Sequence, residues 1–395
     1  MSLRQLPPAA APLTWSDWWR GVAGFFAPDR SLRQLERSLG DGLGVPSVFL
    51  VSSGRAGLTL ILQALQRLSP RRRVIVPGYT CFSVAAAVVK AGLEVVPCEM
   101  SASTLDFDYD ELERLVAAQA PLCVVATHLF GLPADVARVR RICGDRGVFI
   151  VDDAAQALGL ETAAGKLGTL GDVGFYSFDR GKNLTSGHGG AVVTRIPELA
   201  RELERDYGAL GQPAALGGLR SLVEMMVLSV LIRPSLYWIP ASLPFLRLGE
   251  TVYSTEFAVA RLSGVEAGFL TNWRERVKIL NEARAARVAA IRRVRPDLVP
   301  ARADSCIRLP ILCASREERD RVFEEARRAR LGFSLMYPSA IRAIPALAGA
   351  MAEARCPTAD SIAERLVTVP VHPLVSASDN ENIEKVLKGV RPPVQ

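Results

Sequence analysis

The sequence predicts an α/β fold in which a mostly parallel sheet carries helices on both faces. From residue 48 onward, short apolar runs alternate with helical patterns, which is typical of parallel strands joined by crossover helices. The composition agrees, because 49% of the 395 residues are hydrophobic and 23% are charged, which is ample for a large core. The length suggests about two domains.

The elements are assigned in chain order from this alternation. Strands are expected at 48–51, 74–77, 93–97, 122–127, 148–152, 173–178 and 190–194, and helices at 58–68, 109–119, 134–146 and 273–293. We expect an N-terminal arm over 1–45, a large domain over 46–250 and a smaller C-terminal α/β domain over 251–395. In the arm, Trp15, Trp18 and Trp19 are expected to dock on the body or on a partner subunit, because exposed aromatic groups are costly in water.

Charge and cysteine content argue against several classes of protein. The formal charge of +7 is mild for this length and the basic residues are scattered, so nucleic acid is not an expected partner. The seven cysteines include no C-x-x-C pair, which argues against a disulfide framework or a zinc ribbon and for a reducing, cytoplasmic setting. The acidic stretch 106–112 lacks the glycine and distal glutamate of a calcium loop, so it is expected to begin a helix, and no metal site is predicted.

A lysine follows the strand expected at 173–178. Residues 174–190 read GFYSFDRGKNLTSGHGG, so Lys182 lies between a strand end and a glycine-rich turn. A partly desolvated amine loses its proton readily and can attack an aldehyde, which makes Lys182 a candidate for Schiff-base chemistry. A solvated surface lysine is the alternative on this stretch alone.

An aspartate ends the neighbouring apolar run. Residues 148–156 read VFIVDDAAQ, which places Asp152 and Asp153 at a strand end, where parallel α/β sheets bind ligands. A lysine with such a carboxylate is the pair that pyridoxal phosphate requires: the lysine forms an imine and the carboxylate keeps the pyridine nitrogen protonated. Alternatively, Asp153 only caps the next helix.

A third element has the pattern of an anion site. The apolar run 48–51 leads into a Ser/Gly turn that contains Ser53, Gly54 and Arg55, and a helical pattern follows. A helix that begins there presents free backbone N–H groups and its dipole to a phosphate, and Arg55 can add a paired contact. Such turns are common on their own; the three elements together make a specific set.

The stretch 53–194 resembles the DegT/StrS family of pyridoxal-phosphate-dependent sugar aminotransferases, which has the type I aminotransferase fold. The likeness rests on SGRAGLTLIL, VIVPGYTCFSVAAAV, HLFGLPAD, VDDAAQALG and the lysine stretch, with AERLVTVPVHP near the C-terminus. It implies that Lys182 bears the cofactor, that Asp153 pairs with the pyridine nitrogen and that Gln156 lies near the ring's phenolic oxygen. The cofactor-binding residues expected in all are Ser53, Gly54, Arg55, Cys81, Phe82, Asp153, Gln156, Ser177, Lys182 and Asn183.

The residue that stacks on the cofactor ring departs from the family pattern. The family places an aromatic residue where Cys81 stands, with Tyr79 and Phe82 on either side. Either Phe82 or Tyr79 does the stacking after a small backbone shift, or Cys81 packs there as a soft, polarisable group. Tyr79 is also a candidate for substrate contact.

Substrate-side positions differ as well. Tyr337 begins a turn that resembles a family turn ending in a histidine, and Arg342 stands in that place. A guanidinium can hold a diphosphate through paired hydrogen bonds, so we expect an anionic acceptor bound partly by Arg342; alternatively, Arg342 is a surface residue. Arg180 either adds to this contact or points to solvent, and His188 either touches the substrate or only caps the turn. The stretch 251–262 lacks the Asn and Arg through which the family reaches the neighbouring subunit's cofactor.

An apolar segment at 222–247 has two interpretations. No stretch reaches the 18–20 or so apolar residues that span a bilayer. The segment is either a buried interface helix with a crossover, or a monotopic contact with the inner face of a membrane, rimmed by Arg220, Arg233 and Arg247.

The sequence therefore predicts an aminotransferase. Glutamate is the expected amino donor and a keto sugar on a nucleotide carrier the expected acceptor, in polysaccharide or secondary-metabolite synthesis. The resemblance also implies a homodimer with composite active sites. Two alternatives remain: a pyridoxamine-dependent sugar dehydratase, in which histidine typically replaces the lysine, and a regulatory or scaffold protein that retains the fold.

Overall fold

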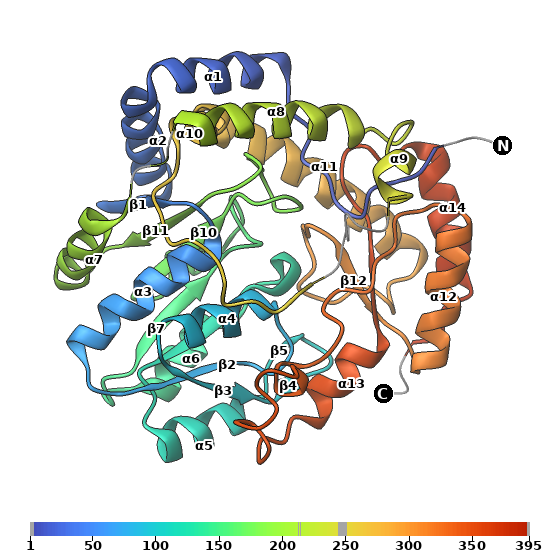
Figure 1. Ribbon diagram of the computed structural model, residues 1–395. Helices are drawn as coiled ribbons and strands as arrows, with labels where there is room; N and C mark the ends of the chain where they lie inside the picture. The colour runs from blue at the N-terminus through green and yellow to red at the C-terminus, as the bar shows by residue number, and fades with distance from the viewer. Residues whose placement is uncertain (1–3, 212, 214, 244–250, 393–395) are drawn as a thin grey trace.

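A seven-stranded sheet forms the centre of the computed structural model, which describes residues 4–211, 213, 215–243 and 251–392 (Figure 1). Its strand order is β1-β11-β10-β7-β6-β2-β3, with bounds β1 Ser47–Val51, β2 Arg73–Pro77, β3 Glu94–Cys98, β6 Cys123–Thr127, β7 Phe149–Asp153, β10 Val173–Ser177 and β11 Gly190–Thr194. The strands from β10 to β3 are parallel, and β11 runs antiparallel to both of its neighbours. The seven predicted strands and the mostly parallel sheet are confirmed, with strand ends shifted by one residue.

Helices cover both faces of the sheet because alternate strand residues face opposite sides. In β2, Val74 and Val76 pack in one apolar cluster with α3 (Gly54–Leu68) and α4 (Phe82–Lys90). Ile75 between them packs in another cluster with α5 (Tyr109–Gln119) and α6 (Val136–Cys143). The side chain of Asp108 caps α5, so the acidic stretch 106–112 begins a helix, as predicted.

The N-terminal helices pack at one end of the sheet. They are α1 (Trp15–Phe26) and α2 (Pro28–Leu43), and both lie against α10 (Gly264–Leu270). Gly24 permits this approach, because a Cβ there would lie 2.0 Å from the Gly264 oxygen. Trp18 docks edge-on against Phe269, with ring centroids 5.4 Å apart. Trp15 and Trp19 are 82% and 72% exposed in the single chain, so they do not dock on its body, and their docking on a partner subunit stays a prediction.

The C-terminal part has an apolar cluster of its own, formed around a small antiparallel sheet. The long helix α11 (Trp273–Val294) leads into it, and its elements are β12 Leu309–Leu312, α12 Arg316–Arg328, η3 Ile341–Ala343, α13 Pro357–Arg365, β13 Leu366–Val369 and α14 Ala377–Lys388. The other elements are β4 Met100–Ser101, β5 Asp106–Phe107, η1 Leu129–Gly131, β8 Glu161–Thr162, β9 Gly165–Lys166, α7 Pro197–Ala209, α8 Ala215–Leu231 and α9 Trp238–Ala241. The predicted smaller α/β unit is thus present, while its boundary at 251 stays a prediction.

The apolar segment 222–247 forms the second half of α8, then a turn and α9. Residues 244–247, including Arg247, lie outside the described part of the chain. None of the helices among the described residues is long and apolar enough to cross a membrane.

Candidate active site

A cleft of about 640 Å³ lies at the carboxyl ends of the parallel strands. Its walls come from the N-terminus of α3, the turn before α4, the ends of β6, β7 and β10, the loop after β10, and the stretch 251–258. The lining includes one residue that was not predicted, Thr80, and these predicted site residues: Ser53, Gly54, Arg55, Cys81, Asp153, Gln156, Ser177, Lys182 and His188. The structure therefore brings the three sequence elements to one place.

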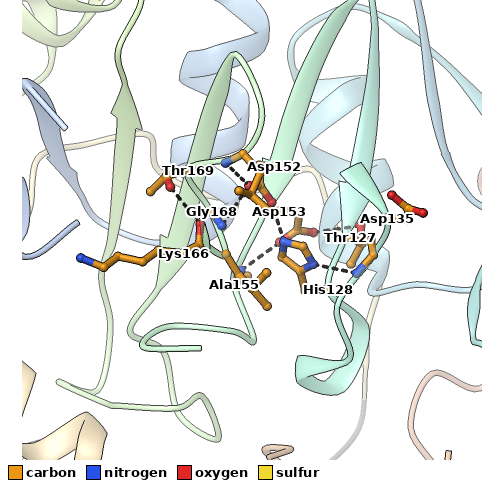
Figure 2. A network of polar contacts seen from close by, with 12 residues as sticks. Thr127, His128, Asp135, Asp152, Asp153, Ala155, Lys166, Gly168 and Thr169 are labelled. Atoms are coloured by element: carbon orange, nitrogen blue, oxygen red, sulfur yellow. Dashed lines mark hydrogen bonds and ion pairs between the residues drawn. The ribbon is translucent and has the colours of Figure 1, made fainter. Parts of the chain in front are cut away.

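Asp153 ends β7 and lines this cleft. Figure 2 shows it with its contacts Thr127 and Ala155. Its two carboxylate oxygens accept hydrogen bonds from the Ala155 N–H at 3.0 Å and the Thr127 hydroxyl at 3.2 Å. Burial raises the pKa of Asp153, while the Ala155 N–H and the positive charge of Lys182 act in the opposite direction. A buried carboxylate with fixed donors is suited to hold a protonated ring nitrogen.

Asp152 points to the other side of the strand and fixes its position (Figure 2). His128 Nδ1 accepts from the Ala134 N–H at 2.9 Å, so His128 Nε2 carries the proton and donates to Asp152 at 2.6 Å. The N–H groups of Gly168 and Leu170 donate to the second Asp152 oxygen at 2.9 and 2.8 Å. The adjacent aspartates therefore divide the work: Asp152 holds the strand end and Asp153 faces the ligand.

Lys182 lies on the loop after β10 and lines the cleft. Hydrogen bonds from Arg284 of α11 hold this loop in place. The Arg284 guanidinium donates to the backbone oxygens of Asn183 at 3.0 Å, Lys182 at 3.5 Å and Ala10 at 3.4 Å. Arg284 is 1% exposed, and burial lowers its pKa to about 10. Sequence reasoning missed it, because an arginine within a charged helical pattern gives no sign that it will be buried.

The predicted anion site is a helix N-terminus in the structure. The Ser53 hydroxyl caps α3 by accepting from the Ala56 N–H at 3.2 Å. Gly54 has to be glycine, because a Cβ there would lie 2.8 Å from the Ser177 Cβ where β10 passes. The Ser177 hydroxyl donates to Asp179 at 3.0 Å. Asp179 also lines the cleft and was not predicted, although it lies within the lysine stretch.

Thr80 provides an independent test of whether pyridoxal phosphate fits. Its hydroxyl is buried on the cleft wall and has no hydrogen-bond partner among the described residues. A buried hydroxyl without a partner is costly unless a ligand completes it. Beside it are a helix N-terminus suited to phosphate, a buried carboxylate and a lysine. This set of donors and acceptors fits the cofactor.

Of the three ring-stacking candidates, the structure brings Cys81 alone to the cleft wall. Cys81 is half-buried, with its sulfur 3.2 Å from the Ser83 hydroxyl. Phe82 begins α4 and packs into the core. Tyr79 is fully buried and its hydroxyl donates to the Met336 backbone oxygen, so the predictions of ring or substrate contact for Phe82 and Tyr79 are not supported within one chain.

Three other predicted residues take different places: Gln156 lines the cleft, whereas Tyr337 and Asn183 lie outside its lining. Gln156 faces the cleft, and its amide accepts from the Phe130 N–H at 2.6 Å and donates to the Tyr337 hydroxyl at 2.7 Å. Tyr337 is 2% exposed, so in this chain it positions Gln156 and does not face a substrate. Asn183 is also buried and donates to Asn281 at 3.4 Å, which places its side chain outside the cleft lining.

His188 and Arg180 lie on the cleft wall next to α8. Both contact the same carboxylate, Glu224 of α8: His188 Nε2 at 3.2 Å and the Arg180 guanidinium at 3.1 Å. The side chains of His188 and Arg180 are 54% and 51% exposed, so each is accessible to a ligand that enters the cleft.

Arg342 does not line the cleft. Its guanidinium forms an ion pair with Asp360, the two side chains being 38% and 26% exposed. The predicted place of Arg342 in the acceptor site is therefore not supported within one chain, because the side chain is absent from the cleft lining.

We expect Arg342→Ala to change the free energy of unfolding by no more than about 1 kcal/mol, the usual worth of a partly exposed ion pair. The Michaelis constant for the acceptor should not change. Thermal melts and steady-state kinetics measure both quantities, and a tenfold rise in that constant would return Arg342 to the acceptor site.

A family model for the DegT/DnrJ/EryC1/StrS aminotransferases matches residues 22–213 and 259–391 of the chain. The protein is 32% identical over 222 residues to an L-glutamine:2-deoxy-scyllo-inosose aminotransferase of Streptomyces fradiae, which is 55% of this chain and 52% of the relative. It is 30% identical over 161 residues to a GDP-perosamine synthase of Vibrio cholerae, which is 41% of this chain and 43% of the relative. The chain thus spans about half the length of these curated relatives.

Solved structures show the same fold. A sugar aminotransferase from Micromonospora echinospora superposes with a TM-score of 0.77 at 24% identity, covering 97% of this chain and 99% of that one. An aminotransferase of pseudoaminic acid biosynthesis from Helicobacter pylori gives 0.78 at 18% identity, covering 98% and 99%. With the family model matched over most of its length, the chain belongs to the DegT/DnrJ/EryC1/StrS aminotransferase family.

Proposed function

We propose that the protein is a pyridoxal-phosphate-dependent aminotransferase that moves an amino group from glutamate to a keto sugar on a nucleotide carrier. The observation that carries the proposal is the placement of Lys182 and Asp153 on one cleft, beside a helix N-terminus and the unpaired Thr80 hydroxyl. The names of the relatives, which include a GDP-perosamine synthase, favour a sugar acceptor.

Each residue of the cleft has a distinct task in this proposal. Bound pyridoxal phosphate supplies an electron sink for the carbon that loses its proton. The Lys182 amine holds the cofactor and then, once free, moves a proton to and from the substrate carbon as general base and acid. The Asp153 carboxylate keeps the ring nitrogen protonated, and Ser53, Gly54 and Thr80 bind the phosphate.

Arg180 is the cleft residue that we assign to the anionic part of the acceptor. It is half-exposed and Glu224 holds it at the wall, so its guanidinium is oriented before the acceptor arrives. A hydrogen bond to a charged group is worth about 1.5–3 kcal/mol, and exposure reduces this figure.

Arg180→Ala should therefore raise the Michaelis constant for the acceptor about tenfold and leave the half-reaction with the amino donor nearly unchanged. Arg342→Ala is the matched control, since it also removes an arginine from an ion pair but lies outside the cleft. Equal damage to both half-reactions in the Arg180 variant would contradict the assignment.

The direct test of the proposed function is the absorbance spectrum of purified protein with added pyridoxal phosphate, before and after glutamate or glutamine. Loss of the bound-cofactor band on adding donor, and its return with a keto sugar nucleotide, supports amino transfer. A band that no donor alters would favour the scaffold alternative, and sugar dehydration without net amino transfer would favour the dehydratase. The homodimer stays a proposal that rests on the family resemblance, and the cytoplasmic setting stays one that rests on the dispersed cysteines.

A further inference from the structure

An apolar face covers the outer side of α1 and α8, which lie along the upper edge of the molecule in Figure 1. We call it the outer apolar face. Its members are large apolar side chains that are 44–82% exposed: Trp15, Trp19 and Phe26 of α1, and Leu216, Leu219, Val223, Met226, Val227 and Val230 of α8. An exposed patch of this kind on a folded chain indicates a surface that something else covers.

The two helices present these side chains in the same direction because both lie on α10. Trp18 of α1 and Met225 of α8 pack in one small cluster with Val265 and Phe269 of α10. The Ser221 hydroxyl of α8 also donates to Glu266 of α10, at 2.5 Å. At helical spacing, the exposed residues fall on the opposite sides of α1 and α8, away from α10.

Most of this face lies outside the residues that the family model matches. The family match stops at residue 213 and resumes at 259, so it leaves out α8 and α9. Among the described residues no helix could cross a bilayer, so a membrane contact here would lie in the interface plane.

Arginines next to the outer apolar face indicate the chemistry of what covers it. A groove of about 610 Å³ beside α2 is lined by Arg30, Arg33 and Arg37 with Arg274, and the one acidic residue of its lining is Asp41. The groove begins four residues after the exposed Phe26, where α1 turns into α2. On α8, the Arg220 side chain lies beside the apolar stripe and is 80% exposed, although it pairs with Glu224 at 2.7 Å.

We propose that the outer apolar face docks on an anionic lipid bilayer as a monotopic contact. Exposed tryptophans are the side chains that favour the bilayer interface, and arginines are attracted to anionic headgroups. Phosphate-bearing headgroups carry negative charge that complements the arginines of the groove. A neutral apolar partner would leave these arginines unpaired. This inference concerns where the protein works, so it does not depend on the proposed reaction.

The contact has a consequence for the cleft, because α8 adjoins it. Glu224 lies on α8 and pairs with Arg180 and His188, both of which line the cleft. Docking through α8 would therefore place this side of the cleft close to the membrane surface.

Flotation of the full-length protein tests the proposal. Purified protein is mixed at low salt with vesicles of phosphatidylcholine alone or of phosphatidylcholine with phosphatidylglycerol, and separated on a density gradient. We expect the protein to float with the anionic vesicles and its tryptophan emission to shift to shorter wavelength. The double variant Val223→Glu, Val227→Glu should reduce the bound fraction about tenfold or more, because two apolar contacts are lost and two negative charges added.

Ile279→Glu is the matched control, because Ile279 is a 56% exposed apolar residue on α11 and not on this face. It should float like the unmodified protein, and circular dichroism shows whether all variants are folded. Protein that stays in the dense fraction with anionic vesicles would overturn the proposal. So would a double variant that floats normally but halves the mass measured by light scattering, because the face would then belong to a second copy of the chain.

Discussion

Lys182→Ala should lower the rate of amino transfer by at least about 10²–10⁴-fold, the range for loss of a positioned general acid–base group. The expected loss is large because this amine has two tasks, holding the cofactor and moving the proton. The variant should still bind pyridoxal phosphate through Asp153 and the N-terminus of α3, since neither is changed. Single-turnover absorbance with the amino donor measures the rate, and borohydride reduction followed by peptide mass analysis identifies the lysine that carries the cofactor.

The control for this experiment is Lys166→Ala. Lys166 is an exposed lysine of β9 whose ammonium donates to the Gly42 backbone oxygen at 2.6 Å, outside the cleft. The Lys166→Ala variant should be active, and borohydride reduction should attach the cofactor to its Lys182. A borohydride label on any other lysine would show that the cofactor site has been assigned wrongly.

Asp153→Asn is expected to reduce turnover by about 10²–10³-fold, the cost of removing one fixed electrostatic contact at a reacting centre. An amide is nearly the same size as the carboxylate and can still contact Ala155 and Thr127, so the fold should be kept. It carries no negative charge, and the ring nitrogen would lose the partner that keeps it protonated. The absorbance of the bound cofactor should shift, and turnover should fall.

Asp152→Asn is the matched comparison one residue away. The three groups around Asp152, which are His128 Nε2 and the N–H groups of Gly168 and Leu170, all donate, so an amide NH₂ would face a donor. We expect a loss of about 1–3 kcal/mol in the free energy of unfolding, with most of the turnover kept at temperatures where the variant is folded. If both variants lost turnover equally while fully folded, the division of roles between the two aspartates would be wrong.

The sheet could be predicted because its strands are short apolar runs, a signal that lies within each run. The position of the cleft could be predicted from the sheet, because the carboxyl ends of parallel strands meet at one edge and bring Asp153 and Lys182 together. What failed depends on partners far apart in the sequence. Tyr79 is held away from the cleft by a hydrogen bond to Met336, 257 residues later.

The site residues that the sequence did not predict also depend on contacts that form only when the chain folds. Thr80 was one of four residues in a turn that sequence alone could not orient, and its unpaired hydroxyl is visible only once the turn is folded. Glu224 interrupts an apolar run, where an isolated charge suggests solvent. Besides Arg220 on the same helix, its partners are Arg180 and His188, which come from the loop after β10.

Arg284 also sets the order in which the site can form during synthesis. Lys182 leaves the ribosome 102 residues before Arg284, and the guanidinium that holds the lysine loop arrives only with α11. The strands that carry Asp153 and Ser177 can pair earlier, since domains form from the N-terminus as the chain emerges. A nascent chain that ends before α11 would thus have the sheet but no fixed lysine loop, and capture of the cofactor would be delayed until α11, in the last third of the protein, has been made.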